Sequence, residues 1–387
     1  MNERRADIDR GPIDDDAHAI LQTPPSSTEA QVLARGIVCA VGGPASLTQL
    51  QTVLLQAVFE AMTGFTIDPT TVEPISAIDF AQALARRNDT FRTRIVQLML
   101  LAAFSVRPLT PEVVSSLGAF ADALEVRDDM IEVATRFAAG ALDLARIDFA
   151  RNGYLGAVSP DRLAALHATS LDSSWGQVVD DPALTARWVS LEALPIGTLG
   201  RGVADFYRDR GFVYPGQLGS TPPLLAQHDW THVLAGYGTA LENEIEVFTF
   251  MARANDDPRA FSLLAMVLSL FETGYLAAGA GLFEANPGHL AETGMAVRLA
   301  DAMRRGAETT GSHDFLDLDW FALADRPLAV VRAEIGVRPK SAGAIAAGSV
   351  SPWEPGGITE YQLRAAASAA LVARIERPPW SADLTRV

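Results

Sequence analysis

The sequence predicts an all-α fold, in which a helical N-terminal domain is followed by a helical metal-binding domain. Apolar residues recur at spacings of three and four through most of the 387 residues, as they do in amphipathic helices. Short connections such as GFTIDPT and SVRPLTPE carry the prolines that start or stop helices, and alternating patterns typical of strands are scarce. Because 49% of the residues are apolar, the chain can bury large cores.

The N-terminal part predicts a polar terminus and a helical domain. Residues 1–28 are polar, acidic and then rich in proline and serine, so we expect them to be disordered. Helical periodicity follows within a domain predicted at 29–152, in the segments 47–62, 80–87, 91–104, 111–126 and 129–150. Their arrangement weakly resembles the tellurite-resistance B-like helical domain, but no acidic metal cluster is obvious. A structural or partner-binding role is therefore the preferred interpretation of this domain.

A second helical domain is predicted at 172–340, followed by a tail at 341–387 with one helix. The most apolar stretch, residues 261–283, reaches the length of a membrane span. Glu272 and several glycines interrupt it, and no positively charged flanks set an orientation. A buried helix or pair of helices is the favoured interpretation. Its small residues at 277–281 would allow a long apolar ligand to approach the backbone.

The segment LLAQHDWTHVLAGYGTALENEIEVFTF, residues 224–250, predicts a metal site on a helix, a glycine turn and a second helix. His228 and His232 stand four residues apart on one helix face, and Asp229 shares that face. Imidazole and carboxylate ligands suit zinc, manganese or ferrous iron. The alternative is a fortuitous pair of histidines on a helix.

Glu244 is the preferred fourth ligand. It follows His232 by twelve residues, too far along one continuous helix, but Gly236 and Gly238 predict a helix end and a reversal between them. Capping signals flank the two helices: Thr239 with Glu242 after the turn, and Ser220 or Thr221 with Pro222 before the first helix. Glu242 is then occupied by the cap, Glu246 shares a polar side with Thr249 and Arg253, and Glu244 lines up with Val247, Phe248 and Met251. A carboxylate that points inward needs a partner or a metal ion.

Other polar residues give weaker candidates. Arg201, on the short helix predicted just before the metal motif, suits a carboxylate or phosphate of a substrate, with a surface role as the alternative. Glu272 is a candidate substrate contact or partner of a metal-bound histidine, or a cap at a helix break. His313 is expected in a solvated loop, and the isolated histidines, expected at the surface, are His18, His167 and His289.

Composition excludes other classes of function and predicts the compartment. A formal net charge of -16 without a basic run disfavours nucleic-acid binding. Cys39 is the only cysteine, which excludes a disulfide framework and a cysteine-based zinc cluster. The N-terminal residues MNERRADIDRGPIDDD lack the apolar segment of a secretory signal, so we expect a cytoplasmic protein.

The metal motif and its flanks resemble the coenzyme Q biosynthesis protein 4 family over about residues 172–340. An H-D-x-x-H motif with a glutamate twelve residues later is accompanied by three similar segments, LPIGTLGRGVADFYRDRGFVYPG, HVLAGYGTALENEIEV and DWFALADRPLAVVRAEIGV. The resemblance implies that zinc is bound by His228, Asp229, His232 and Glu244. It further implies peripheral contact with the inner face of the cell membrane, binding of prenylated quinone precursors, and association with other quinone-biosynthesis proteins.

We therefore expect a zinc-dependent lyase of ubiquinone or related quinone biosynthesis, which removes the C1 carboxylate of a polyprenylated hydroxybenzoate with or without oxidation. Asp229 is expected to act as a ligand or as the catalytic general acid or base. A non-catalytic scaffold that binds prenyl lipid and holds zinc structurally is the first alternative. A metallopeptidase is the second, because H-E-x-x-H uses the same spacing. The sequence leaves a homo-oligomer open.

Overall fold

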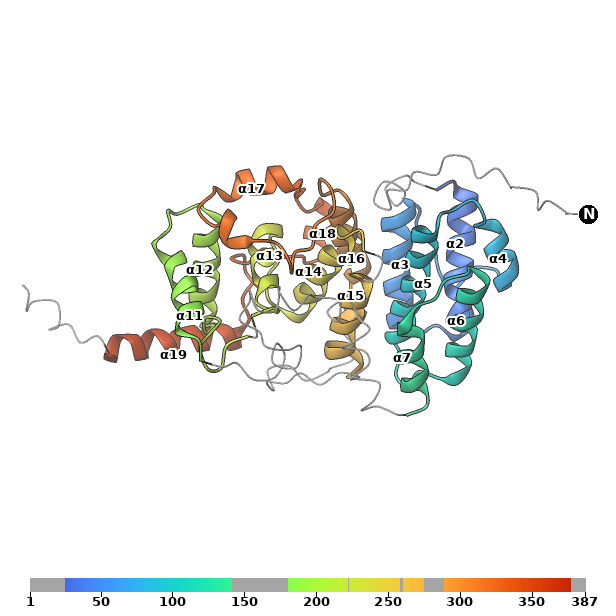
Figure 1. The fold of residues 1–387 in the computed structure, drawn as a ribbon, viewed down its shortest axis with the longest axis horizontal. Coiled ribbons are helices and arrows are strands. Elements are labelled where there is room, and N and C mark those ends of the chain that lie inside the picture. Colours follow the sequence, from blue (N-terminus) through green and yellow to red (C-terminus); the bar gives the residue numbers. More distant parts are fainter. Residues whose placement is uncertain (1–24, 141–179, 222, 258–259, 275–288, 377–387) are drawn as a thin grey trace, which may run out of the picture.

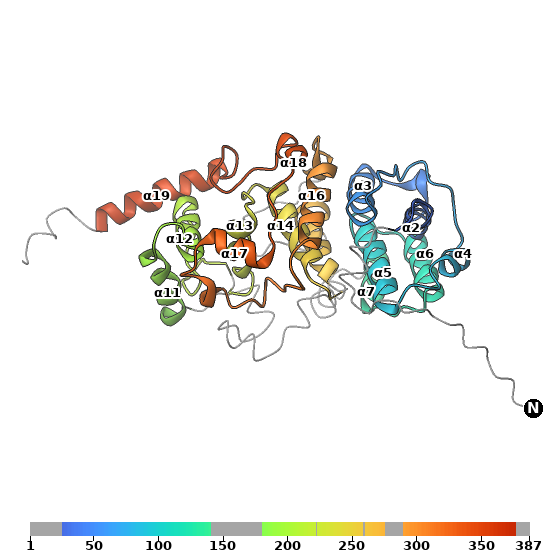
Figure 2. The same cartoon turned by 90° about the horizontal axis from the view of Figure 1, so that it is seen from above.

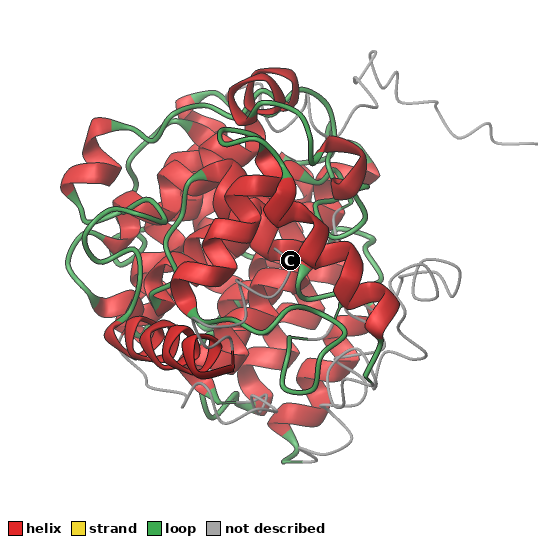
Figure 3. Ribbon diagram, turned by 90° about the vertical axis from the view of Figure 1, so that its left-hand side faces the viewer, coloured by secondary structure: helices red, strands yellow, loops and turns green. Residues whose placement is uncertain are grey.

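The computed structural model describes residues 25–140, 180–221, 223–257, 260–274 and 289–376. Within these ranges the structure is built from helices and contains no strand, so the all-α prediction is confirmed. Figure 3 shows helices joined by loops throughout the described part. An isolated antiparallel bridge joins Thr198 to Pro327.

Six helices of the N-terminal region lie together on one side of the molecule (Figures 1 and 2). They are α2 (Ser27–Ala40), α3 (Gln49–Thr63), α4 (Ala77–Ala83), α5 (Asp89–Phe104), α6 (Pro111–Ala123) and α7 (Asp129–Ala138). The predicted helical segments fall on α3 to α7, whereas α2 was not among them. Residues 1–24, residues 141–150 of the last predicted segment and the connection between the two predicted domains lie outside the described residues.

The second region places its helices around α14, followed by the tail. These helices are α11 (Pro182–Val189), α12 (Leu199–Arg210), α13 (Gln227–Ala235), α14 (Leu241–Ala254), α15 (Phe261–Leu268), α16 (Met295–Ala307) and α17 (Leu328–Ile335), and in the tail α18 (Ala342–Ala346) and α19 (Glu360–Glu376). Short turns of helix join some of them: η3 (Ser190–Ala193), η5 (Ser269–Thr273), η6 (His289–Ala291) and η7 (Trp320–Leu323). The tail was predicted to hold one helix and holds two in its described part.

The two regions pack directly against each other. Helix α3 lies along α16, as Figures 1 and 2 both show, and α5 packs against α15. One continuous cluster of buried apolar side chains draws on both regions. The fully buried Arg94 of α5 donates to the backbone oxygens of Asn255 (3.2 Å) and Asp256 (2.7 Å), just after α14. The domain division at 29–152 and 172–340 remains a prediction, since the connecting residues are outside the described part.

The apolar stretch at 261–283 begins as a buried helix. Every residue of α15 is buried, and η5 continues it as a π-helical turn that ends at Gly274. Residues 275–288, including the small residues predicted to admit a ligand, lie outside the described ranges. Among the described helices, none combines the length and the apolar character needed to cross a bilayer.

Part of the tail returns to the turn between α13 and α14. The Gly238 amide donates to the Val350 oxygen and the Thr239 amide to the Gly357 oxygen, each at 3.0 Å. Helix α19 then packs across α12 and extends beyond it (Figures 1 and 2). The approach is close, because a Cβ added at Gly211 would lie 2.5 Å from the Ala366 nitrogen. The tail thus covers the turn on which the predicted metal site depends.

Candidate metal centre

A helix, a glycine turn and a second helix carry the predicted ligands. Helix α13 ends at Gly236, which adopts φ +78°, a left-handed conformation that favours glycine. The predicted upstream cap at Ser220 or Thr221 is wrong, because α13 begins only at Gln227 and has no side-chain cap. Residues 223–226 form turns instead, in which the amides of 227–229 bond to oxygens three residues earlier. Pro222 lies outside the described residues.

The predicted capping box after the turn is also wrong. Helix α14 follows Ala240 without a side-chain cap. Thr239 Oγ1 donates to Gln362 Oε1 at 2.6 Å, and Glu242 Oε1 lies 3.1 Å from His289 Nδ1. Both polar groups are therefore paired with residues far away in the sequence. His289 was predicted to be an isolated surface residue, and it is instead largely buried against Glu242.

The second face of α14 is buried as well. Glu246 was predicted on a polar side, but it is fully buried and pairs with Arg298 Nη2 of α16 at 2.7 Å. Asn243 Nδ2 donates to the same carboxylate oxygen at 2.7 Å. The prediction failed because α16 covers this face of α14. Glu246 therefore has partners of its own, away from the ligand cluster.

The structure brings His228, Asp229, His232 and Glu244 together. Glu244 Oε2 lies 3.4 Å from His228 Nε2 and 3.2 Å from His232 Nε2. Asp229 Oδ1 lies 3.5 Å from His228 Nε2, and one donor atom from each of Asp229 and the two histidines falls within a 4.8 Å group. The four side chains range from fully buried to 13% exposed. Glu244, inferred from its helix face alone, does point toward the histidines.

These separations suit a four-coordinate ion. Ligand bonds of about 2.0–2.1 Å in tetrahedral geometry place neighbouring donor atoms roughly 3.3 Å apart. The three measured separations of 3.2, 3.4 and 3.5 Å lie close to that value. A nitrogen and an oxygen at such distances also suit a hydrogen bond, so the direction of the histidine rings must be considered.

Both histidines turn Nε2 toward Glu244. His232 Nδ1 lies 3.2 Å from the Tyr237 oxygen, and His228 Nδ1 contacts the Leu225 oxygen. A backbone carbonyl only accepts, so each Nδ1 carries a proton, and Nε2 is the nitrogen that each ring can offer to a metal ion. This carbonyl-supported arrangement is common for metal-bound histidine. Two Nε2 atoms and a carboxylate oxygen this close would repel one another through their lone pairs, unless a proton or a metal ion lies between them.

The histidines and carboxylates of the cluster strongly shift one another's pKa values. Burial lowers the pKa of His228, but Asp229 and Glu244 outweigh it and raise that pKa to about 9. Burial raises the pKa of Glu244, but His232 and His228 outweigh it and lower that pKa to about 2. Burial raises the pKa of Asp229 against the effect of both histidines. With neutral imidazoles, two buried carboxylates require two positive charges, which a divalent ion would supply.

Aromatic rings hold the two imidazoles in place. Phe206 of α12 stacks on His232 with ring centroids 5.5 Å apart, and Phe248 of α14 stacks on His228 at 5.0 Å. The Nε2 positions are thus fixed before any ion binds. Such ordering lowers the conformational entropy lost on binding.

The sequence analysis missed two residues of α12, one that contacts the cluster and one that holds the neighbouring turn. The Tyr207 hydroxyl donates to Asp229 Oδ2. The fully buried Arg210 donates to Thr239 Oγ1 (3.0 Å) and to the oxygens of Pro352 (2.7 Å) and Gly357 (2.9 Å). Burial lowers the pKa of Arg210 to about 10, opposed by the charges of Asp229 and Glu244. The sequence could have indicated that both residues are buried, because helical spacing places them on the same face as the apolar residues Leu199, Val203 and Phe206.

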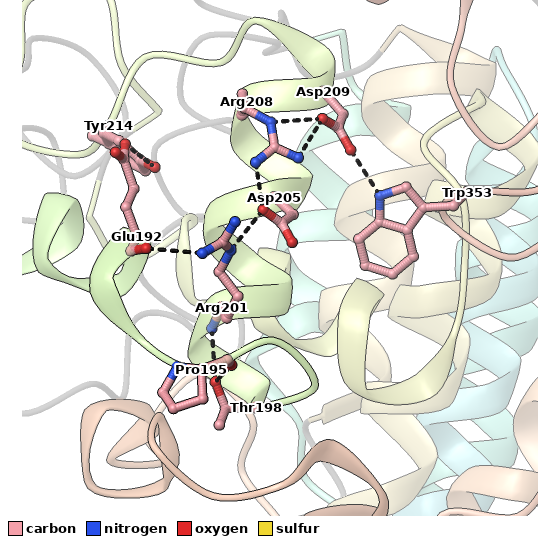
Figure 4. Close-up of polar contacts among 9 residues, drawn as sticks. All are labelled: Glu192, Pro195, Thr198, Arg201, Asp205, Arg208, Asp209, Tyr214 and Trp353. Carbon is pink, nitrogen blue, oxygen red and sulfur yellow. Dashed lines mark hydrogen bonds and ion pairs between the residues drawn. The ribbon is translucent and has the colours of Figure 1, made fainter.

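Arg201 points away from the cluster. Figure 4 shows its guanidinium held by Asp205 Oδ1 (2.9 Å) and the Glu192 oxygen (3.0 Å). Along the same face, Arg208 bonds to Asp205 and Asp209, and the tail residue Trp353 donates to Asp209 (3.1 Å). Arg201 and Arg210 are nine residues apart, about two and a half helical turns, and so lie on opposite faces of α12. The substrate-binding role of Arg201 stays a prediction.

Glu272 is buried within η5, where Oε1 accepts the Leu290 amide at 3.0 Å. This contact links η5 to η6 on the other side of residues 275–288, which lie outside the described residues. The substrate-binding role of Glu272 stays a prediction. His313 lies in a loop, as expected, with Nε2 2.9 Å from the Thr310 oxygen. His18 and His167 lie outside the described residues.

Comparisons with known proteins give little further information. No family model matches the chain, and no curated protein matches it. Among solved structures, the chain is similar to a protein described as "Putative ubiquinone biosynthesis protein" from Nostoc punctiforme PCC 73102, with 19% identity. The match covers 65% of this chain and 99% of that chain at a TM-score of 0.28. A similarity of this size does not establish a common fold or a common function.

Proposed function

We propose that His228, Asp229, His232 and Glu244 bind a zinc ion. The observation that carries the proposal is the convergence of the two Nε2 atoms on Glu244 Oε2, at separations of 3.2 and 3.4 Å. Two nitrogen and two oxygen donors suit zinc, and the short separations favour tetrahedral coordination. The charge of the ion would balance the two buried carboxylates.

We further propose that the site acts in quinone biosynthesis by removing the C1 carboxylate of a polyprenylated hydroxybenzoate. The sequence resemblance over 172–340 supports this chemistry. The bond between the ring and the carboxylate breaks, carbon dioxide leaves, the electron pair stays on the ring carbon and a proton replaces the carboxylate. Zinc would stabilise the negative charge that develops during this step. His228 and Glu244 are the most exposed of the four residues, at 13% and 11%, so a substrate would approach at their edge.

A structural zinc in a prenyl-lipid-binding scaffold is the second candidate. Its support is that Glu244 lies beside the group formed by His228, Asp229 and His232, so that the chain could supply all four ligands of a closed structural site, and that the tail covers the adjoining turn. A metallopeptidase is less well supported, because Asp229 Oδ2 accepts from Tyr207 and is not free to activate water. Contact with a membrane surface, association with other quinone-biosynthesis proteins and self-association accompany both quinone hypotheses as proposals.

Metal content of the purified protein tests the site. We expect one zinc per chain in the wild type and a large loss in His232→Ala. His313→Ala is the matched control, since that histidine lies in a loop away from the cluster. Equal metal content in His232→Ala and wild type would contradict the proposed site.

Incubation with a polyprenylated hydroxybenzoate then separates the two candidate functions. A lyase releases carbon dioxide, and the release should disappear in His232→Ala but persist in His313→Ala. A protein that extracts the prenyl lipid and releases no carbon dioxide would support the scaffold.

A further inference from the structure

We propose that Tyr207 is a positioning residue that fixes Asp229 as a metal ligand through one carboxylate oxygen. This inference rests on the metal site proposed above and deepens it. It assigns Asp229, for which the sequence allowed both roles, to metal binding and not to proton transfer.

The two oxygens of Asp229 have different neighbours. Oδ2 accepts from the Tyr207 hydroxyl, while Oδ1 lies 3.5 Å from His228 Nε2 on the side of the cluster. If both oxygens bound one ion, the ion would compete with the Tyr207 hydroxyl for Oδ2 and weaken the hydrogen bond of a buried phenol. The hydrogen bond therefore favours binding through Oδ1 alone.

Tyr207 cannot easily turn away from Asp229. Its side chain is 2% exposed and lies among other rings. Centroid distances are 5.2 Å to Trp188, 5.3 Å to the stacked ring of Tyr214 and 5.7 Å to the perpendicular ring of Phe212. Packing of this kind fixes the hydroxyl before an ion arrives, as partners of metal ligands commonly are fixed.

The contacts of the two Asp229 oxygens also prevent this residue from acting as a general acid or base. A general acid or base must come within hydrogen-bond distance of a substrate proton or of a bridging water. The Asp229 side chain is only 7% exposed, one oxygen is occupied by Tyr207 and the other faces the histidines. Neither oxygen is directed toward solvent.

Cobalt(II) in place of zinc tests this arrangement, because its visible absorption is stronger in four-coordinate than in five-coordinate sites. Tyr207→Phe keeps the ring and removes the hydroxyl, which frees Oδ2 to bind as a second oxygen. We expect the affinity for cobalt to fall about 10–100-fold and the visible absorption to weaken. Tyr214→Phe is the matched control, because its ring stacks on Tyr207 but its hydroxyl donates to Glu192 at 3.0 Å (Figure 4). It should bind cobalt as the wild type does.

A second comparison excludes a general packing effect. In an Asp229→Asn background the residue no longer offers a carboxylate, so adding Tyr207→Phe should change cobalt affinity little. An additive loss in the double variant would overturn the inference, as would an unchanged affinity or spectrum in Tyr207→Phe alone. Wild type that binds neither zinc nor cobalt would overturn the metal site itself, a different outcome from the failure of Tyr207→Phe.

Discussion

Replacing Gly238 by alanine is expected to push the tail away from the turn between α13 and α14. A Cβ at Gly238 would lie 2.7 Å from Gly357 Cα and 3.0 Å from the Gly357 oxygen. These are backbone atoms, and the Gly357 oxygen also accepts from the Thr239 amide and from Arg210. The tail therefore cannot move by a few tenths of an ångström without straining those bonds.

Overpacking of this kind costs about 1–3 kcal/mol. The entropy of unfolding is about 2.1 cal/mol/K per residue, so for 387 residues each kcal/mol lowers the melting temperature by about 1 °C, and we expect a decrease of roughly 1–4 °C. Circular dichroism melting measures that decrease. Hydrogen exchange adds a local measurement, because the Thr239 amide donates to Gly357 and should exchange faster once the tail is displaced.

Gly118→Ala is the matched control for this substitution. Gly118 lies within α6, and no heavy atom lies within 4 Å of a Cβ added there. Alanine is favoured over glycine in a helix by about 0.5–1 kcal/mol, so this variant should be as stable as wild type or more stable. If Gly238→Ala has the same melting temperature as Gly118→Ala, and its Thr239 amide exchanges hydrogen as slowly as in wild type, then the tail does not constrain the turn.

Three further predictions concern the ion and the charges around it. Metal affinity should rise with pH up to about 9, because Asp229 and Glu244 outweigh burial and raise the pKa of His228 to about 9, and the ring must lose a proton before it can bind the ion. Calorimetry in buffers of different protonation enthalpy counts the protons released on binding. An affinity that does not change with pH would contradict the expectation. The metal-free protein should lose stability as pH falls from about 4.5 to about 2, because His232 and His228 outweigh burial and lower the pKa of Glu244 to about 2. A lowered carboxyl pKa stabilises the fold above the unfolded value and ceases to do so as pH falls through the folded value, so urea unfolding of Glu244→Gln should lack this acid-dependent loss. Zinc at a thousand times its dissociation constant should stabilise wild type by about 4 kcal/mol, and chelation should remove that gain in wild type while leaving the melting of His232→Ala unchanged.

Local patterns predicted much of the fold and part of the candidate site. Periodicity located α3 and α5 because the alternation of apolar and polar residues depends only on helix geometry and burial. The helix face likewise selected Glu244, because residues that share a face with Phe248 and Met251 turn toward the same neighbour. Glycine at 236 predicted the helix end because a left-handed residue there rarely carries a side chain.

Predictions failed where distant partners replaced local ones. Thr239 and Glu242 have the spacing of a capping box, but Gln362 and His289 bond to them instead. Tertiary contacts of this kind have no local sequence signature. Tyr207 escaped notice for the same reason, because a phenol within an apolar stripe is identified as core until its acceptor is known.

The charge of the loaded site connects Arg210 to the proposed substrate. A divalent ion, two neutral histidines and two carboxylates together have a net charge of zero. The fully buried Arg210 adds one positive charge, and the charges of Asp229 and Glu244 act on its pKa against the effect of burial. Buried charge that is not balanced is costly, so the centre would favour an anionic ligand over a neutral one. The carboxylate of an aromatic acid meets this requirement, whereas its decarboxylated product does not. The same charge that attracts the substrate would therefore promote release of the product.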